Sequence, residues 1–154
     1  MNLYILRHAD ADTEAATDAA RTLSEKGEEQ ARKVAQFCRT HGIQPEVIFA
    51  SPLIRAQQTA KPVAKELNVA LTTARWLACG ATPEGIFAEL AVLKNVSAVM
   101  LVGHEPDLGN LIAHLLGAAS GSIHVRKASL TLIEVLVPRK GGGRLEFSMP
   151  VRMM

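Results

Sequence analysis

The feature that most constrains the fold is an unbroken run of apolar residues, Ala98-Val99-Met100-Leu101-Val102. A strand with one wet face alternates polar and apolar residues, whereas this run contains no polar position. Such runs are typical of parallel strands that helices cover on both faces of a sheet. The run therefore favours an α/β fold.

The remaining apolar segments repeat an alternation of strand and helix. Short strands are predicted at residues 3–6 and 47–50, with a further one at 70–73. Helix-start signals predict helices that open at Ser24, Ser51, Thr82 and Pro106. Pro62 is expected to kink or shorten the second of these helices. The alternation indicates a parallel sheet between layers of helices.

The end of the chain has a different pattern. Residues 128–137 and 145–149 are rich in β-forming residues, and the turn Gly141-Gly142-Gly143 joins them as an antiparallel hairpin. No internal repeat or boundary divides the chain. We therefore expect a single domain over residues 1–154, of the α/β class: a three-layer α/β/α sandwich with a mostly parallel sheet and a C-terminal antiparallel hairpin.

Basic and imidazole side chains stand where three of the predicted strands end. Arg7 and His8 directly follow the first strand. Arg55 lies in the first turn after the second strand, and His104 follows the strand at 97–102. The carboxyl ends of parallel strands meet at one edge of the sheet, beside helix N-termini that favour anions. Because a guanidinium matches phosphate oxygens, the sequence predicts a phosphoryl-binding site at this edge.

His8 adds a nucleophile to the predicted site. A neutral imidazole can attack phosphorus and form a covalent phosphohistidine, which water hydrolyses in a second step. The attacking nitrogen must be unprotonated, so we expect the other ring nitrogen to donate to a carbonyl or carboxylate. Two guanidiniums and a second imidazole can neutralise the transferred group without a metal, and no cofactor is expected.

Three motifs, in this order along the chain, carry a family resemblance. Leu6-Arg7-His8-Ala9 is similar to an RHG-type signature, with Ala9 where Gly is common. Residues 51–60, SPLIRAQQTA, resemble an SPxxRAxQTA segment, and residues 102–106, VGHEP, resemble a distal (G/S)H motif. The chain thus resembles the histidine phosphatase superfamily, also called phosphoglycerate-mutase-like. Its short length and residues 21–27 are similar to the SixA-type branch, which dephosphorylates phosphohistidine on signalling or phosphotransfer proteins.

The resemblance implies roles for individual residues. His8 would be the catalytic nucleophile, and Arg7, Arg55 and His104 would bind the phosphoryl oxygens. Arg21 would be an additional basic contact for the substrate, with a solvated loop residue as an equal alternative. The implied partner is a phosphorylated protein that carries a phosphotransfer domain.

The chain departs from the wider superfamily in its general acid. Many members place a carboxylate a few residues before a Gly, but residues 75–80 contain no acid. Glu84 is the fallback proton donor, with Asp10 and Glu105 as others. General acid help contributes ~10²–10⁴-fold when the leaving group is an alkoxide, but matters much less for an easily protonated imidazole. The missing acid therefore favours protein phosphohistidine as the substrate.

Two other functions remain open from the sequence. The first is a phosphatase that acts on small phosphate esters, and the second is a non-catalytic phosphate-binding module. The module is weakened by His8, which a binder does not need. The ester phosphatase is weakened by the short chain, which leaves no room for large insertions that would enclose a small substrate.

Charge and composition exclude other classes. The formal net charge is +2, too small to indicate nucleic-acid or membrane binding. Cys38 and Cys79 form no CxxC pair, so neither a disulfide framework nor a structural zinc site is expected. We expect a cytoplasmic protein, since no leader and no apolar run of membrane-spanning length is evident. The oligomeric state is open.

Several charged segments have simple interpretations. Residues 9–22 form a long predicted loop, and its acids Asp10, Asp12 and Asp18 are expected to be solvated. The C-terminal third is basic, which indicates either a solvated hairpin rim, the favoured interpretation, or a docking patch. Its basic residues are Arg126, Lys127, Arg139, Lys140 and Arg144. Lys127 is the one expected to approach the rim of the site.

Overall fold

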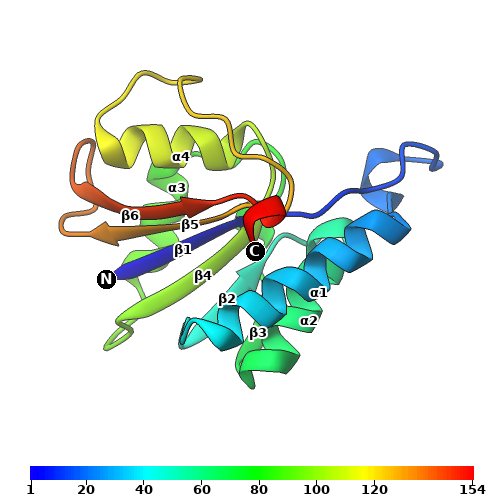
Figure 1. Cartoon of the computed structure of the whole chain (residues 1–154). Helices are drawn as coiled ribbons and strands as arrows, with labels where there is room; N and C mark the ends of the chain where they lie inside the picture. Colours follow the sequence, from blue (N-terminus) through cyan, green and yellow to red (C-terminus); the bar gives the residue numbers. More distant parts are fainter.

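A mixed six-stranded sheet organises the chain in the computed structural model, which describes all residues, 1–154 (Figure 1). The strands are β1 (Asn2–Arg7), β2 (Val47–Ala50), β3 (Ala70–Thr73), β4 (Ala98–Gly103), β5 (Leu130–Val135) and β6 (Gly143–Met149). Their order is β3-β2-β4-β1-β5-β6. The first four strands are mutually parallel, and β5 and β6 form an antiparallel hairpin on the edge beside β1. The predicted sheet is confirmed.

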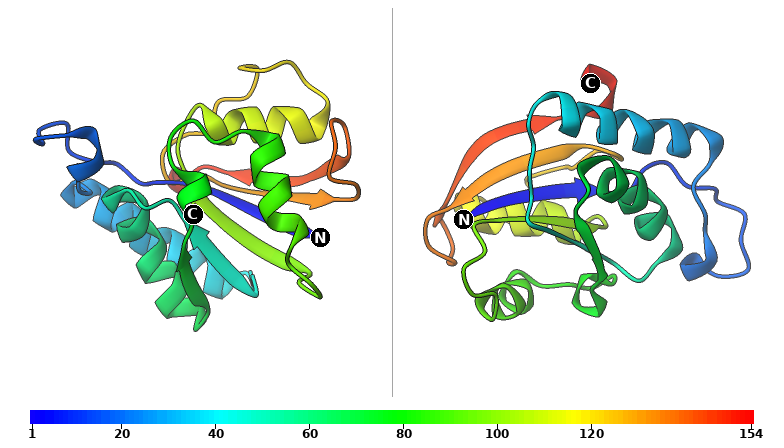
Figure 2. Two further views of the ribbon diagram at one scale, coloured as in Figure 1. Left: turned by 180° about the vertical axis from the view of Figure 1, so that it is seen from behind. Right: turned by 90° about the horizontal axis from the view of Figure 1, so that it is seen from below.

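Four helices cover the sheet on its two faces (Figures 1 and 2). They are α1 (Glu25–Thr40), α2 (Ile54–Leu67), α3 (Pro83–Ala91) and α4 (Asp107–Leu116). Three short 3-10 helices complete the chain: η1 (Asp18–Ala20), η2 (Arg75–Leu77) and η3 (Val151–Met153). The helix α1 packs with α2 on one face, and α3 packs with α4 on the other, so the three-layer sandwich is confirmed.

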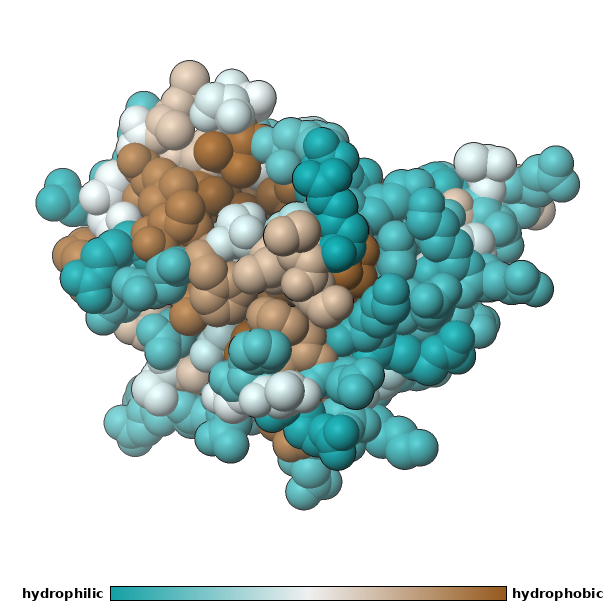
Figure 3. All heavy atoms as spheres, viewed as in Figure 1, coloured by the Kyte–Doolittle hydropathy of each residue, from teal (hydrophilic) through white to brown (hydrophobic).

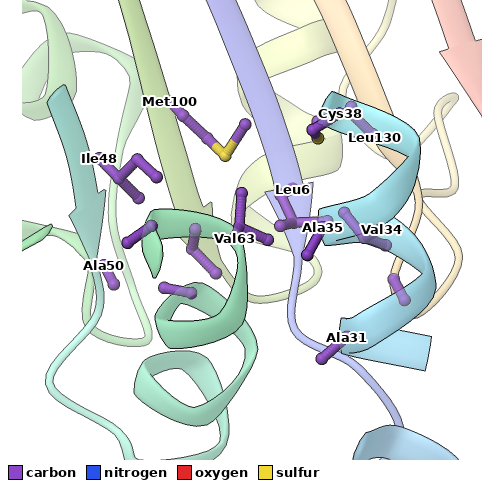
Figure 4. Close-up of a cluster of buried hydrophobic side chains, with 14 of the residues drawn as sticks. Leu6, Ala31, Val34, Ala35, Cys38, Ile48, Ala50, Val63, Met100 and Leu130 are labelled. Carbon is purple, nitrogen blue, oxygen red and sulfur yellow. The ribbon is translucent and has the colours of Figure 1, made fainter. Parts of the chain in front are cut away.

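Two apolar cores lie on opposite sides of the sheet because strand side chains alternate in direction. In β1, Leu6 points to the core shared with α1 and α2, and Ile5 points to the core shared with α3 and α4. Figure 4 shows the first core, where Leu6, Met100 and Ile48 meet Val63 of α2 and helix α1. All six residues of β4 are buried, as its unbroken apolar run predicted.

Two of the helix starts were predicted correctly by their capping residues. The Ser24 Oγ accepts a hydrogen bond from the Gly27 N–H at 3.1 Å and caps α1. The Thr82 Oγ1 accepts from the Gly85 N–H at 3.2 Å and caps α3. Each cap satisfies one of the N–H groups that a helix start leaves without an intrahelical partner.

The prediction for the start of α2 is wrong. This helix begins at Ile54, its N-cap is Leu53, and no side chain caps it. The Ser51 hydroxyl lies instead 2.7 Å from the His104 ring, so tertiary contact outweighed the local capping preference. Pro62 does not shorten α2, which runs on to Leu67. Buried Ala60 and Val63 hold the helix against the sheet on either side of Pro62.

Candidate active site

The carboxyl ends of β1, β2 and β4 lie side by side and bring the predicted residues together. Arg7 pairs in register with Gly103, and Ala50 pairs with Val102. The residues that follow these strands therefore meet at one edge. The His8 and His104 ring centroids are 5.2 Å apart. The charges of Arg7 and Arg55 both act on these two imidazoles.

His8 is held in one protonation state by its own chain. Its Nδ1 lies 2.7 Å from the Ala9 carbonyl oxygen. A carbonyl oxygen only accepts hydrogen bonds, so Nδ1 carries the proton and Nε2 keeps a free lone pair. Burial, together with nearby His104, Arg55 and Arg7, lowers the pKa of His8 to about 3 despite the bond to Ala9. At neutral pH the His8 ring is therefore uncharged.

The turn after β1 is fixed by Thr59 of α2. The Ala9 N–H donates to the Thr59 Oγ1 at 2.9 Å, and that hydroxyl donates to the Arg55 carbonyl at 2.7 Å. Thr59 is fully buried. This link holds Ala9, whose carbonyl sets the His8 tautomer, and explains why a Thr stands four residues after Arg55.

The two glutamines between Arg55 and Thr59 support the same edge. The Gln57 amide donates to the Ser51 carbonyl at 2.7 Å and to the Ala50 carbonyl at 3.2 Å. The Gln58 Oε1 accepts from the Leu23 N–H at 2.7 Å and anchors the end of the loop 9–22. Each polar residue of this motif therefore fixes backbone around the site.

His104 faces the site with one ring nitrogen and is anchored by the other. Its Nε2 lies 2.7 Å from the Ser51 Oγ. Burial, followed by the positive charge of Arg55, lowers the pKa of His104 to about 4. With the Ser51 hydroxyl as donor to Nε2, the neutral ring presents an Nδ1–H to the site.

Three buried nitrogens of this site have no partner in the protein. They are Arg7 Nε, Arg55 Nε and His104 Nδ1, and no other buried side-chain nitrogen or oxygen is unpaired. Leaving a buried donor unpaired costs about 1–3 kcal/mol. The concentration of all three in one place indicates a site shaped for an external acceptor.

One terminal nitrogen of the Arg7 guanidinium is already hydrogen-bonded within the protein. The Arg7 Nη1 donates to the Val125 carbonyl at 2.7 Å. Glu105 fixes that segment, because its Oε1 accepts from the Val125 N–H at 2.6 Å and its Oε2 from the Gly109 N–H at 2.9 Å. Glu105 thus positions Arg7 and has both oxygens occupied.

Asp18 is a site residue that the sequence analysis missed. The sequence predicts a solvated loop residue at this position, but the Asp18 Oδ2 accepts from the Arg55 Nη2 at 2.9 Å. Its Oδ1 accepts from the Arg21 Nη1 at 3.1 Å. These two bonds hold the pKa of the Asp18 carboxyl below its ordinary value. The unusual length of the loop 9–22 was the only signal in the sequence.

Asp10 was also interpreted wrongly as a solvated residue. It accepts from the Lys127 Nζ and from the Ser24 Oγ, at 2.6 and 2.7 Å. The pKa of Asp10 is lowered by these two hydrogen bonds. Lys127 therefore does lie near the rim of the site, paired with an acid.

Arg21 and Glu84 lie in different surroundings. Arg21 reaches the site through Asp18, and its Nε also donates to the Asp12 carbonyl at 2.6 Å. Glu84 is 74% exposed, and its only ionic neighbour is the His114 ring at 3.8 Å. The structure does not bring Glu84 into contact with Arg7, His8, Arg55 or His104.

No three side chains of His, Cys, Asp or Glu gather in a way that would hold a metal ion. None of the helices combines the length and the apolar character needed to cross a bilayer. A sheet edge that brings together an uncharged imidazole, two guanidiniums and unpaired buried donors is typical of proteins that transfer phosphoryl groups through histidine.

Comparison with known proteins agrees with that class. The family model described as the histidine phosphatase superfamily (branch 1) matches residues 3–78. The chain is 33% identical over 128 residues to the phosphohistidine phosphatase SixA homolog of Haemophilus influenzae, covering 76% of this chain and 78% of the relative. It is 29% identical over 155 residues to the phosphohistidine phosphatase SixA of Escherichia coli, covering 97% and 93%.

A solved structure extends the likeness to the whole fold. The protein histidine phosphatase SixA complexed with tungstate superposes with a TM-score of 0.86 at 26% identity, covering 99% of this chain and 98% of that one. The chain belongs to the histidine phosphatase superfamily, and its relatives in sequence and structure are of the SixA type.

Proposed function

We propose that this protein is a phosphohistidine phosphatase that works through a covalent intermediate on His8. The observation that carries the proposal is the bond from His8 Nδ1 to the Ala9 carbonyl, which leaves Nε2 unprotonated in a ring that lies near His104 and the charges of Arg7 and Arg55. Relatives named phosphohistidine phosphatase support the choice of substrate.

The first step transfers the phosphoryl group to the enzyme. The His8 Nε2 attacks phosphorus, a new P–N bond forms, and the P–N bond to the substrate histidine breaks. Charge on the three equatorial oxygens is neutralised by Arg7 and Arg55, and the His104 Nδ1–H donates to one of them. The leaving imidazole nitrogen takes up a proton and departs as neutral histidine.

The second step restores the enzyme. Water attacks phosphorus, the bond to Nε2 breaks, and inorganic phosphate is released with His8 neutral again. No metal ion takes part in either step of this proposal, so a chelator is expected to leave the rate unchanged.

The carboxylates near the site support phosphohistidine over an ester substrate. Both oxygens of Glu105 accept backbone N–H groups, and Asp10 is paired with Lys127. Asp18 has a lowered pKa, which makes it a poor proton donor at neutral pH. An alkoxide leaving group would need such a donor. A phosphorylated imidazole has a second, basic ring nitrogen that takes up a proton from solution near neutral pH, so it leaves as a neutral ring without a donor from the enzyme.

The natural partner in this proposal is a phosphorylated protein. We also propose that the phosphatase works in the cytoplasm. Cys38 and Cys79 are both free thiols, as expected in a reducing compartment.

The test offers the enzyme a phosphohistidine-bearing phosphotransfer domain and a panel of phosphate esters, with His8→Ala as the control. We expect the phosphoprotein to be turned over fastest and the variant to be inactive. Faster turnover of the esters would contradict the choice of substrate, and full activity of the variant would contradict the covalent mechanism.

A further inference from the structure

A basic groove of about 420 Å³ lies beside the candidate active site. Arg7 lines the groove, whereas His8, Arg55 and His104 do not. Besides Arg7 it is lined by the cationic residues Lys26, Arg126, Lys127 and Arg152, and by one carboxylate, Asp10. Five cations thus face one acid in a protein whose net charge is only +2. The groove concentrates positive charge that composition alone does not reveal.

Three of the groove's cations have no partner. Lys127 is neutralised by Asp10 at 2.6 Å, but Lys26, Arg126 and Arg152 form no ion pair or side-chain hydrogen bond within the protein. All three are exposed. Unpaired cations around a concave surface focus the field and attract anionic ligands.

The groove is built from segments that are far apart in the sequence. Lys26 lies in the first turn of α1, Arg126 lies in the connection from α4 to β5, and Arg152 lies in η3. The C-terminal η3 packs beside α1, as Figure 1 and the right-hand view of Figure 2 show. In Figure 3 hydrophilic side chains cover the side of the molecule over α1, whereas apolar ones gather toward β5, β6 and α4.

The groove continues away from the active site. A second hollow of about 200 Å³ shares Lys26, Gln30, Val151 and Arg152 with the first. It also contains Lys33 and Glu29, which pair with each other at 3.6 Å, so Lys26 and Arg152 are its unpaired cations. A ligand in this channel therefore runs from Arg7 outward between α1 and η3. That path has the form expected for an extended chain attached to the phosphoryl group.

We propose that this groove docks an acidic segment that flanks the phosphohistidine of the protein substrate. The proposal rests on the proposed function, since Arg7 belongs to both the groove and the phosphoryl site. A polypeptide fits better than a nucleic acid, because no Phe, Tyr or Trp lines the groove on which bases would stack. A concave channel also fits a chain better than a flat lipid surface.

The experiment measures kcat/KM for three phosphohistidine substrates. They are free phosphohistidine, a peptide with phosphohistidine between glutamates, and the same peptide with lysines in place of the glutamates. For the wild-type protein we expect kcat/KM for the glutamate peptide to exceed that for the lysine peptide by about ten-fold or more, and to fall more steeply with added salt.

The variant Lys26→Glu/Arg152→Glu reverses charge inside the groove. It is expected to lose the preference for the glutamate peptide, with a loss in kcat/KM about ten-fold greater for that peptide than for free phosphohistidine. The matched control Lys65→Glu/Lys94→Glu makes the same change in net charge at exposed lysines outside the groove. It should keep the preference, and thermal melting of both variants checks that they fold.

The outcomes separate the two proposals. Absence of turnover for all three substrates by the wild-type protein would overturn the proposed function. Equal kcat/KM for the two peptides, or a preference that survives in Lys26→Glu/Arg152→Glu, would overturn the groove while the function stands. An oligonucleotide that binds more tightly than the glutamate peptide, and only when Lys26 and Arg152 are intact, would assign the groove to a different partner.

Discussion

At His8, one hydrogen bond decides which ring nitrogen keeps a free lone pair. The Ala9 carbonyl fixes the proton on Nδ1, and the Thr59 hydroxyl fixes Ala9. The need for such an acceptor could be predicted from the chemistry of a histidine nucleophile. Its identity could not, because Ala9 supplies it through the backbone, which no side-chain pattern reveals.

The Asp18 carboxylate competes with an anionic substrate for the positive charge of Arg55. This carboxylate pairs with Arg55 and so brings negative charge to the place where we propose that phosphoryl oxygens bind. We predict that Asp18→Asn, which keeps a polar side chain beside Arg55 but removes the charge, strengthens competitive inhibition by inorganic phosphate several-fold.

The control for that prediction is Asp12→Asn in the same loop. The side chain of Asp12 is exposed, and only its backbone carbonyl contacts Arg21. Its inhibition constant for phosphate should stay at the wild-type value. Weaker inhibition in Asp18→Asn would mean that the carboxylate serves mainly to hold Arg55 in place.

Between secondary-structure elements, the first turn of α1 packs against the turn at residues 8–10, which contains His8. The Ser24 N–H donates to the Asp10 carbonyl at 3.1 Å, and Gly27 is buried beneath it. The helix and its Ser24 cap could both be predicted from local sequence. The contact between α1 and residue 10 could not, because it joins two elements across the long loop 9–22.

Gly27 tests how close that contact is. A Cβ at this position would lie 1.9 Å from the Asp10 carbonyl oxygen, so Gly27→Ala must displace backbone. We predict a loss of about 1–3 kcal/mol in the free energy of unfolding, measured with urea, and a lower kcat because Asp10 follows the His8-Ala9 turn.

Gly85→Ala is the matched control, at the third residue of α3. The nearest atom to its Cβ would be the Thr82 Oγ1 at 3.2 Å, a side-chain atom that has room to adjust. Its kcat should be unchanged. Equal effects of the two substitutions would show that α1 does not support the catalytic turn.

Over the whole molecule, the parallel sheet made most of the site predictable. Once strands at 3–6, 47–50 and 97–102 are parallel neighbours, the positions of Arg7, Arg55 and His104 follow from topology. The role of Ser51 as a partner of His104 and the groove beside η3 depend on contacts between distant segments. Local capping rules even gave Ser51 a different role.

Two buried neutral imidazoles also make the stability of the whole fold depend on pH. The folded pKa values of His8 and His104 are about 3 and about 4, below the ordinary value of 6.5. Between pH 6.5 and 4 the unfolded chain therefore binds protons that the folded chain does not. Folding stability must fall as the pH falls through this range.

We predict that the melting temperature decreases progressively between pH 7 and pH 4.5. The double variant His8→Asn/His104→Asn removes both groups and should show a shallower decrease over the same range. Parallel pH profiles for the two proteins would contradict the assignment of neutral, buried imidazoles to the site.

The most direct test of the account is to trap the phosphorylated enzyme and locate its phosphate. The protein is mixed with a phosphohistidine substrate, quenched in alkali within milliseconds, and analysed by mass spectrometry and ³¹P NMR. We expect a phosphate on Nε2 of His8 and none in His8→Ala. Phosphate on Nδ1 of His8, or on another residue, would contradict it.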